Sequence, residues 1–596
     1  MSYPEQPIGT GQVPPVGQHP PQQYRPEQYP PHQQPPHQQP PHQQPPPQYP
    51  PRQAAAGSAG PALLGVVLLL PALVALILSY VVPTFSTVLT SFRQEDLIRT
   101  PRSAGVDNYR TIFEDGLLSQ IGLVVLLALL PLAFALVLAP LLALVADRAG
   151  RRARLLTRAV LALPVAGYAP VAMFLGWRLH RSEPEFSVAG ARLELTWVVA
   201  ATSFGLVVAV AATAFLSALR RPESGRWPFQ AVLTVAGFVG LAVLAAVIQI
   251  YTAPALLTGG GPTRSTVTPV LGAVQVGFVT FRLGVGAATS TLLLVMLGVL
   301  GLVAAGLLVV TRTRIEFDGW RDRPGPAPGP APGPAGGRSG LLFGIVVAAL
   351  VVLLAVFAWA AAPWLRYAFS SPDMPGGPGL PEILVDTWLP PLVSALVSVG
   401  LAAVAGFGIG ALRPLGRWSE LLLLPFAPWL FVGTGPLAIA NFKWVSENDL
   451  LNTFLGLIPP VWLSVPALFV CTLLFRGLEP RWRSDGDPAR TVLLPALPML
   501  AAAVLLTWLF HAQQLLWPLL VAPSLENAPA PLLANLWAQQ FRSSSGESLS
   551  LILPLPFLVL FLLAFVALQV GYLDRLAVRA GRSSAEPVPP PPGGAG

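Results

Sequence analysis

The sequence is poor in the residues that most enzymes use for chemistry. Of its 596 residues only 11% are charged, and it contains a single cysteine and a single lysine. With Cys471 alone there can be no internal disulfide and no cysteine metal cluster, so we expect no metal site. Lys443 stands outside any glycine-rich frame, and the chain therefore lacks the phosphate-binding loop of an ATPase. We expect no catalytic residues and no cofactor bound by this chain.

Hydrophobic residues, in contrast, make up 53% of the sequence. Several runs reach roughly 20 apolar residues, the length that crosses the core of a bilayer, which predicts an all-α polytopic membrane protein. The net charge of +8 is spread over short loops between these runs. We interpret it as a determinant of membrane topology and expect no nucleic-acid partner.

About twelve transmembrane helices are predicted, in two groups of six. The first group lies near 62–82, 118–145, 159–177, 196–219, 229–251 and 286–311, and the second near 341–362, 392–412, 419–439, 454–475, 491–511 and 551–572. None of these segments contains an internal Asp, Glu or Lys. Since intramembrane carboxylates usually mark ion-coupled carriers, their absence argues against a secondary carrier.

The domain organisation follows from these groups. A Pro/Gln/His-rich tail, 1–60, precedes a first six-helix unit, 61–321; a Pro/Gly/Ala-rich linker, 322–340, leads to a second unit, 341–582, and a tail, 583–596. Basic residues favour the loops on the side of the N-terminal tail, which predicts that both termini and the linker are cytoplasmic. An even number of spans in each half makes the two units parallel copies in tandem.

Two polar stretches allow more than one interpretation. The tail repeats Pro-Pro-His-Gln-Gln around His32, His37 and His42, and composition predicts disorder; it could also dock a proline-binding partner or capture metal weakly. An arginine cluster could anchor topology or bind lipid phosphate or a partner. Its members are Arg148, Arg151, Arg152, Arg154 and Arg158.

Glycines mark a turn between the fifth and sixth apolar segments. Gly259, Gly260 and Gly261 precede Pro262, and three glycines before a proline can adopt backbone angles that other residues avoid. We expect this outer-loop motif, in the stretch Ile250 to Phe281, to form a tight turn at the outer membrane face.

The amino-acid sequence around this turn resembles that of a known family. "LLTGGGP", followed by Thr/Ser and Phe281-Arg282-Leu283-Gly284, is similar to the permease subunits of binding-protein-dependent carbohydrate ABC importers (maltose/glycerol-3-phosphate type). Further matching phrases are "VDNY" at 106–109, "LLLLPFAPWLFVGTGPLAI" at 421–439 and "LLWPLLV" at 515–521. The resemblance covers most of 60–320 and 341–582 and implies two permease units fused in one chain.

The resemblance also implies partners: a dimer of separate ABC ATPase subunits that use ATP, an extracytoplasmic solute-binding protein, and the bilayer of a prokaryotic cytoplasmic membrane. The family's ATPase-docking (EAA) loops are degenerate here. The remnants are Arg220, Arg221 and Glu223 in the first half and Asp485 and Gly486 in the second. The first loop is too short, and too broken by Pro and Gly, for the usual docking helix. The second keeps Asp485-Gly486 but lacks the Glu-Ala-Ala, and both flanks are contracted.

A sugar or similar polyol-like solute is the expected cargo. Amide and phenol groups can bind hydroxyls, and indole rings can stack on a sugar ring. The candidate path residues are Gln249, Tyr251, Trp177, Trp508, His511, Gln513 and Gln514. Two alternatives stay open: a permease-derived scaffold no longer coupled to ATP, and a secondary carrier.

Overall fold

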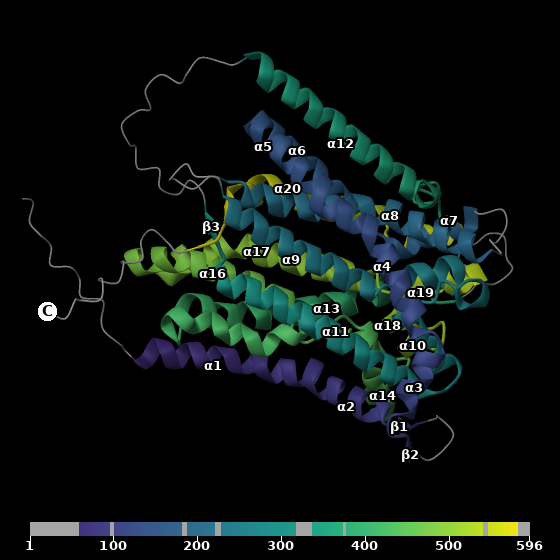
Figure 1. Ribbon diagram of the computed structural model, residues 1–596. Coiled ribbons are helices and arrows are strands. Elements are labelled where there is room, and N and C mark those ends of the chain that lie inside the picture. Colours follow the sequence, from purple (N-terminus) through teal and green to yellow (C-terminus); the bar gives the residue numbers. More distant parts are fainter. Residues whose placement is uncertain are drawn as a thin grey trace, which may run out of the picture. The chain divides into compact units, whose positions relative to one another are not determined.

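The computed structural model describes residues 59–95, 101–180, 187–220, 228–317, 336–372, 377–539 and 546–581 (Figure 1). Within these ranges the chain is almost entirely helical, and its strands form two antiparallel two-stranded ladders. The predicted tails and most of the linker fall outside the described residues.

The first half contains six long helical segments. They are α1 (Ala59–Leu76) continuing through the π turn η1 (Ile77–Val81) into α2 (Val82–Ser91); α4 (Leu117–Ala133), η2 (Phe134–Leu138) and α5 (Ala139–Ala149); α6 (Arg151–Ala166) with α7 (Pro170–His180); α8 (Val188–Ala218); α9 (Phe229–Ile248); and α11 (Leu283–Val310). Shorter elements are β1 (Arg93–Gln94), β2 (Arg102–Ser103), α3 (Asp107–Glu114), η3 (Pro254–Thr258), η4 (Pro262–Arg264), α10 (Pro269–Val274), η5 (Gln275–Val279) and β3 (Arg314–Phe317).

The second half follows a similar order. Its main elements are α12 (Gly336–Leu365); α13 (Leu380–Phe407) with η6 (Gly408–Leu412); the 3₁₀ helix η7 (Gly416–Trp429) with η8 (Gly435–Leu437) and α14 (Ala438–Glu447); α16 (Val465–Asp485); η9 (Ala489–Leu493) with α17 (Leu494–Ala512); and α20 (Leu555–Gly571). The remainder are α15 (Phe454–Leu457), α18 (Leu516–Val521), α19 (Ala530–Gln539), η10 (Glu547–Leu551), η11 (Leu573–Arg575) and β4 (Leu576–Arg579).

Long apolar helices define the class of protein. In the described part of the chain nine helices are long and apolar enough to cross a membrane, and the pair α6 and α7, bent by 69°, would be a tenth. Large apolar side chains such as Leu63, Leu118 and Val310 are between 66% and 82% exposed on these helices. Such extended apolar surface is stable against lipid rather than water. The chain is an all-α, multi-pass membrane protein.

Two of the twelve predicted spans do not appear as long apolar helices. The segment expected at 419–439 is instead η7, a turn, η8 and the start of α14, because Pro425, Pro428 and Pro436 interrupt the α-helical hydrogen bonds. The segment expected at 454–475 breaks at Pro459 and Pro460. There α16 begins only at Val465, and it runs on through charged residues to Asp485.

A third difference concerns the acidic residues. The span expected at 392–412 begins at Leu380, so Glu382 and Asp386 lie inside it, and the expectation of segments free of carboxylates is wrong here. Gly379 and Pro381 start the helix early, and the Oε2 atom of Glu382 accepts the Gly379 N–H at 3.0 Å. This capping contact offsets an unsatisfied donor of the first turn.

The two halves exchange helices in matching pairs. The first segment of each half packs on the second segment of the other: α1 on α13, and α12 on α5. The last long helix of each half packs on the third segment of the other: α20 on α6, and α11 on η7. Close approach is built into the last pair, since a Cβ atom on Gly301 of α11 would lie 2.1 Å from the carbonyl oxygen of Ala427.

The same exchange continues beyond the last helices. Strand β3 follows α11 and strand β4 follows α20, and the two pair antiparallel, with Arg314 opposite Arg579. Gly477 of α16 lets β3 approach, because a Cβ atom there would lie 1.8 Å from the Ile315 carbonyl oxygen. This ladder lies at the end of the helices where α1 begins (Figure 1), which we call the predicted inner end.

Candidate functional site

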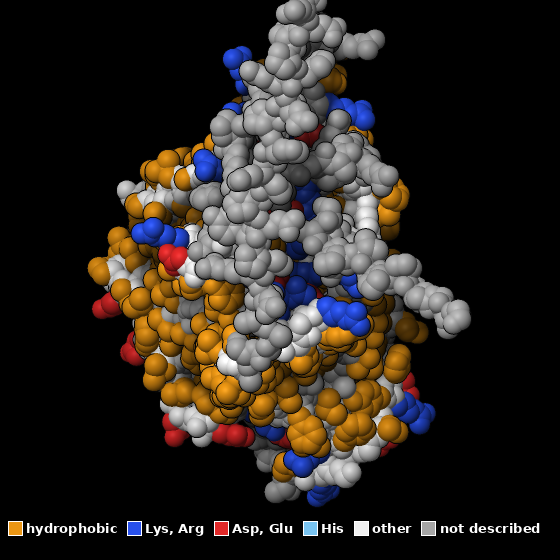
Figure 2. All heavy atoms as spheres, turned by 90° about the vertical axis from the view of Figure 1, so that its left-hand side faces the viewer, with side chains coloured by type: hydrophobic (Ala, Val, Ile, Leu, Met, Phe, Trp, Pro, Cys, Tyr) orange, Lys and Arg blue, Asp and Glu red, His pale blue; other side chains and the backbone are white. Residues whose placement is uncertain are grey.

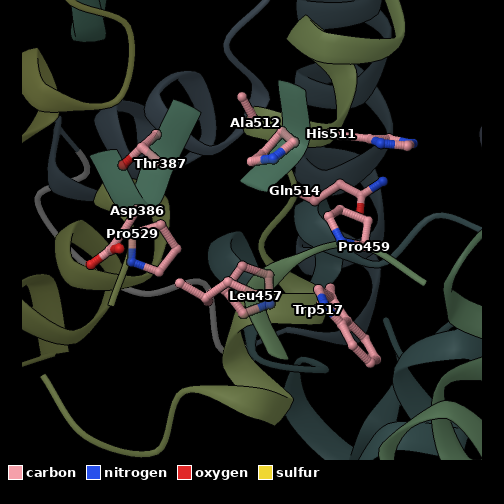
Figure 3. A pocket seen from close by; sticks show the side chains of 11 residues that line it. Asp386, Thr387, Leu457, Pro459, His511, Ala512, Gln514, Trp517 and Pro529 are labelled. Carbon is pink, nitrogen blue, oxygen red and sulfur yellow. The ribbon is translucent and has the colours of Figure 1, made fainter. Parts of the chain in front are cut away.

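A small cavity with both polar and apolar walls lies in the second half, between α13 and the end of α17. Asp386 and Thr387 of α13 lie on one side of it and His511 and Gln514 on the other (Figure 3). Its walls are completed by prolines, Leu457 and the indole of Trp517. The cavity brings together two of the seven predicted path residues, His511 and Gln514.

Polar atoms in this cavity lack partners among the described residues. His511 Nδ1 and Gln514 Oε1 are buried without a hydrogen bond. Asp386 as a residue is 9% exposed, and no hydrogen bond or ion pair to the described residues holds its carboxylate. Buried polar groups are normally satisfied, so the two unsatisfied atoms of His511 and Gln514 make this cavity the candidate binding site. Asp386 escaped sequence reasoning because the helix was expected to start after it.

Gln249 connects the two halves away from this cavity. Its Nε2 donates to the carbonyl oxygen of Phe431 at 2.7 Å, and its Oε1 accepts the Gly433 N–H at 2.7 Å. Tyr251 lies two residues further along the chain and is buried. Burial raises the pKa of its phenol to about 12, so the hydroxyl stays protonated. The amide of Gln249 is thus occupied by backbone of the other half.

Trp177 and Trp508 lie in two separate aromatic clusters. The Trp177 indole N–H donates to the Ala360 carbonyl oxygen at 2.8 Å, and its ring packs against Trp197 and Trp359. The Trp508 N–H donates to the Trp388 carbonyl oxygen at 2.8 Å. Its ring contacts the rings of Trp388, Phe557 and Phe561. Gln513 is also bonded internally, with Nε2 donating to the Ile552 carbonyl oxygen at 3.0 Å.

The glycine motif forms the predicted turn. Gly259, Gly260 and Gly261 all have positive φ, at 60°, 103° and 69°, and Pro262 opens the short helix η4. The turn is closed by the Gly261 N–H donating to the Thr258 carbonyl oxygen at 2.8 Å. A Cβ atom on Gly261 would lie 2.6 Å from Thr266 Oγ1, which explains the small residue there.

A further contact, at the end opposite to the predicted inner end, was not expected from sequence. Asn108 donates to the carbonyl oxygens of Ser91 and Arg93 at 2.8 and 2.9 Å, fixing the loop after α2. Gly284 lets this loop lie on α11, because a Cβ atom there would lie 2.0 Å from the Arg93 carbonyl oxygen. In the same region Glu95 of the first half forms an ion pair with Lys443 of the second.

At the predicted inner end one carboxylate lies among three arginines. Asp574 Oδ1 lies 3.0 Å from Arg154 Nε, 3.3 Å from Arg158 Nε and 3.3 Å from Arg220 Nη2. Arg158 is fully buried and also donates to Ser217 Oγ at 3.1 Å and Gln569 Oε1 at 3.3 Å. Figure 2 shows basic side chains near the middle of this face, with hydrophobic side chains on either side. We call this group the Asp574 cluster.

The second half has its own ion pairs at this end. Arg476 Nε lies 2.9 Å from Glu420 Oε1, and Arg413 Nη1 lies 3.1 Å from Glu479 Oε2. Arg476 Nη1 also donates to the Thr313 carbonyl oxygen of the first half at 3.3 Å. In both halves, therefore, the end of the fourth long helical segment binds the chain that follows the last helix of the other half.

The predicted docking residues occupy different settings. Arg220 belongs to the Asp574 cluster, while Arg221 and Glu223 lie outside the described residues. Asp485 ends α16, and Gly486 caps it in the left-handed region at φ 78°. Because Asp487 then accepts the N–H of Ala489 at 2.9 Å and η9 begins at once, the turn between α16 and α17 contains no separate helix.

No protein-family model matches this sequence, and no curated protein matches it. Among the described residues, no group of three or more His, Cys, Asp and Glu side chains could hold a metal ion. The class that the fold defines is thus a multi-pass helical membrane protein whose two halves exchange their first and last helices.

Proposed function

We propose that this chain is the transmembrane permease component of an importer, in which two interlocked halves move against each other to pass a solute across a prokaryotic cytoplasmic membrane. The observation that supports it most is the reciprocal packing of α20 on α6 and α11 on η7. Two related halves around a shared axis can open alternately to either side, which is a common basis of transport.

Besides the packing of helices, polar contacts join the two halves at both ends of the helices. At the predicted inner end they are the β3–β4 ladder and the Asp574 cluster. At the opposite end they are the Glu95–Lys443 ion pair and the hydrogen bonds of Gln249. A transporter needs one such set of contacts to break while the other holds, and polar contacts on short backbone segments suit that exchange.

The expected cargo and partners rest on the family resemblance. We propose a sugar or similar polyol-like solute, delivered by an extracytoplasmic binding protein and driven by separate ABC ATPase subunits. These would bind the predicted inner end near the end of α16, where Trp482 and Arg483 precede the Gly486 cap. Without a docking helix in this turn, the contact area would be smaller than in related systems.

Affinity purification tests this proposal. The tagged chain is extracted from its native membrane in mild detergent, and the proteins that accompany it are identified. Recovery of an ATPase subunit supports the proposal, and its reproducible absence contradicts ATP coupling. Arg483, on α16, has a side chain that is 66% exposed. Changing it to Glu should reduce the amount of ATPase subunit that is recovered with the chain.

A secondary carrier is the second candidate, and Asp386 favours it. This residue lies within the span Leu380–Leu412, where ionisable groups commonly mark ion or proton pathways. Uptake that survives ATP depletion but is lost with an ionophore would support the carrier over the ATP-driven permease.

A further inference from the structure

We propose that the turn between α5 and α6 binds the phosphate head groups of anionic lipids. Three exposed arginines form its surface: Arg148 in the last turn of α5, and Arg151 and Arg152 in the first turn of α6. We call these three residues the α5–α6 basic turn. It lies at the predicted inner end, where α5 and α6 meet (Figure 1). The proposal does not depend on the permease function above.

The structure divides the arginine cluster of the sequence into two sets. Arg154 and Arg158 face Asp574, whose Oδ1 atom is 3.0 and 3.3 Å from their Nε atoms. Asp147, the carboxylate next to the turn in sequence, is also paired, with Oδ1 3.4 Å from Arg154 Nη1. The side chains of the basic turn, in contrast, form no ion pair or hydrogen bond with the described residues. Their three charges are therefore available to a ligand outside this part of the chain.

Exposed leucines share the helix faces of these arginines. On α5, Leu141 lies two helical turns before Arg148, on the same face. On α6, Leu156 lies one turn after Arg152, again on the same face. The two leucines are 53% and 37% exposed, and α5 ends the candidate span Leu117–Ala149. A lipid matches this arrangement, because its acyl chains can cover the leucines while its phosphate reaches the arginines at the edge of the bilayer core.

The backbone at the start of α6 also favours an anion. Gly150 is the N-cap of this helix and has no side chain to cap the free N–H groups of the first turn. These groups carry the positive end of the helix dipole, so Arg151 and Arg152 beside them raise the local positive charge further. A bound phosphate would offset this repulsion, and the guanidinium fork can form two parallel hydrogen bonds with its oxygens. The turn is open, since a Cβ atom on Gly150 would meet no other atom within 4 Å.

The second half repeats this layout with less charge. In its equivalent turn, between η6 and η7, Arg413 faces inward, and its Nη1 atom lies 3.1 Å from Glu479 Oε2. Arg417 is exposed, and its guanidinium carbon lies 5.2 Å from the ring centre of Trp418, which is 54% exposed. Tryptophan is enriched where lipid head groups begin. Each half thus combines an inward, paired arginine with an outward one at this turn, and its three exposed arginines make the first turn the stronger anion site.

Native mass spectrometry of the purified full-length chain tests the proposal, because it identifies each bound molecule by its mass. The probes are dioleoylphosphatidylglycerol and dioleoylphosphatidylcholine, which have the same acyl chains and differ in the net charge of the head group. Ammonium phosphate and a hexaglutamate peptide are added as competitors, with ammonium acetate at the same ionic strength as their control. We expect the first phosphatidylglycerol to bind about tenfold or more tightly than phosphatidylcholine, and neither competitor to displace it beyond the acetate control.

Variants assign the bound lipid to the basic turn. Arg151→Gln with Arg152→Gln should weaken the binding of phosphatidylglycerol about tenfold or more, since each basic residue near an anionic lipid surface contributes about fivefold. Arg151→Lys with Arg152→Lys keeps both charges and should retain most of the affinity. The matched control, Arg110→Gln with Arg490→Gln, removes two exposed arginines that already form ion pairs with acidic neighbours. It should leave the preference for phosphatidylglycerol unchanged.

Four results would overturn the proposal. They are equal binding of the two lipids, unchanged phosphatidylglycerol binding in the glutamine double variant, an equal loss in the matched control, and displacement by either competitor. Displacement by phosphate would make the turn a site for a soluble anion, and displacement by hexaglutamate would make it a surface for an acidic protein. Circular dichroism and the thermal unfolding midpoint establish that each variant is folded. The permease function is tested by ATPase recovery and solute uptake, which this experiment does not measure.

Discussion

Arg154 and Asp574 are 420 residues apart in the chain, yet their Nε and Oδ1 atoms lie 3.0 Å apart. Arg154 is on α6 of the first half, and Asp574 follows α20 of the second. This ion pair is one of several contacts in which the segment after the last long helix of one half packs against the other half. The predicted inner end of the protein is thus built jointly by both halves.

Removing the carboxylate of this pair should destabilise the protein strongly. Asp574→Asn leaves Arg154, Arg158 and Arg220 without their shared anion, and Arg158 is fully buried. Breaking a buried pair typically costs about 3–5 kcal/mol. We expect a lower thermal unfolding midpoint in detergent for this variant.

Glu114→Gln is the control for this prediction. Glu114 is 65% exposed, and its ion pair with Arg110 lies within a single helix, α3. Surface pairs of this kind contribute roughly 0–1 kcal/mol. Equal midpoints for Asp574→Asn and the wild type would show that the cluster does not hold the halves together.

Gly301→Ala should separate α11 from η7. The added Cβ atom would lie 2.1 Å from the Ala427 carbonyl oxygen, so the two segments must move apart, at a cost of about 1–3 kcal/mol. Gly306→Ala on the same helix meets nothing within 4 Å and should be neutral or slightly stabilising, since Ala favours helix over Gly. The difference between the two thermal unfolding midpoints reports how tightly α11 packs on η7 at Gly301. Similar midpoints for the two variants would contradict this close packing.

Cutting the chain within 322–335 should not separate the halves. Because α1 packs on α13 and α12 on α5, each half needs the other to bury its first helix. Co-expressed fragments, with a tag on one only, are expected to purify as an equimolar pair in mild detergent. Recovery of the tagged fragment alone, folded and monodisperse, would show that each half is an independent unit.

Charge reversal tests the ion pair between Glu95 and Lys443. Both side chains are less than a quarter exposed, and each belongs to a different half. Lys443→Glu should lower stability by bringing two carboxylates together, and Glu95→Lys added to it should restore much of the loss. A double-mutant cycle on unfolding midpoints should give a coupling of about 0.5–3 kcal/mol. Additive effects of the two changes would mean that the residues do not interact.

Sequence patterns predicted the apolar helices well, because a run of about 20 apolar residues has few other uses. They were less reliable where polar residues enter a span. Asp386 was placed outside the membrane helix because hydropathy rises only after it, although the capping contact of Glu382 starts the helix at Leu380. The apolar composition of the η7 segment predicted a straight membrane-spanning helix. Pro425 and Pro428 lie inside it, and the segment is a 3₁₀ helix instead.

The contacts of the candidate site depend on tertiary packing. Gln249 and Trp508 were chosen for the chemistry of their side chains, but partners distant in sequence, Phe431 and Trp388, decide which of their atoms are free. The glycine turn was predictable because its backbone angles are local to three consecutive residues. The Asp574 cluster was not predictable, because its charged members come from α6, the end of α8 and η11, which composition cannot bring together.

Solute uptake by native cells tests the central claim most directly. Cells that lack this chain and cells complemented with it are compared for accumulation of labelled sugars and polyols, with and without ATP depletion and with an ionophore. The account predicts that at least one of these solutes accumulates only in complemented cells, that ATP depletion abolishes the accumulation, and that the ionophore does not. Accumulation that follows an ion gradient without ATP, or no difference between the two cell lines for any solute, would contradict it.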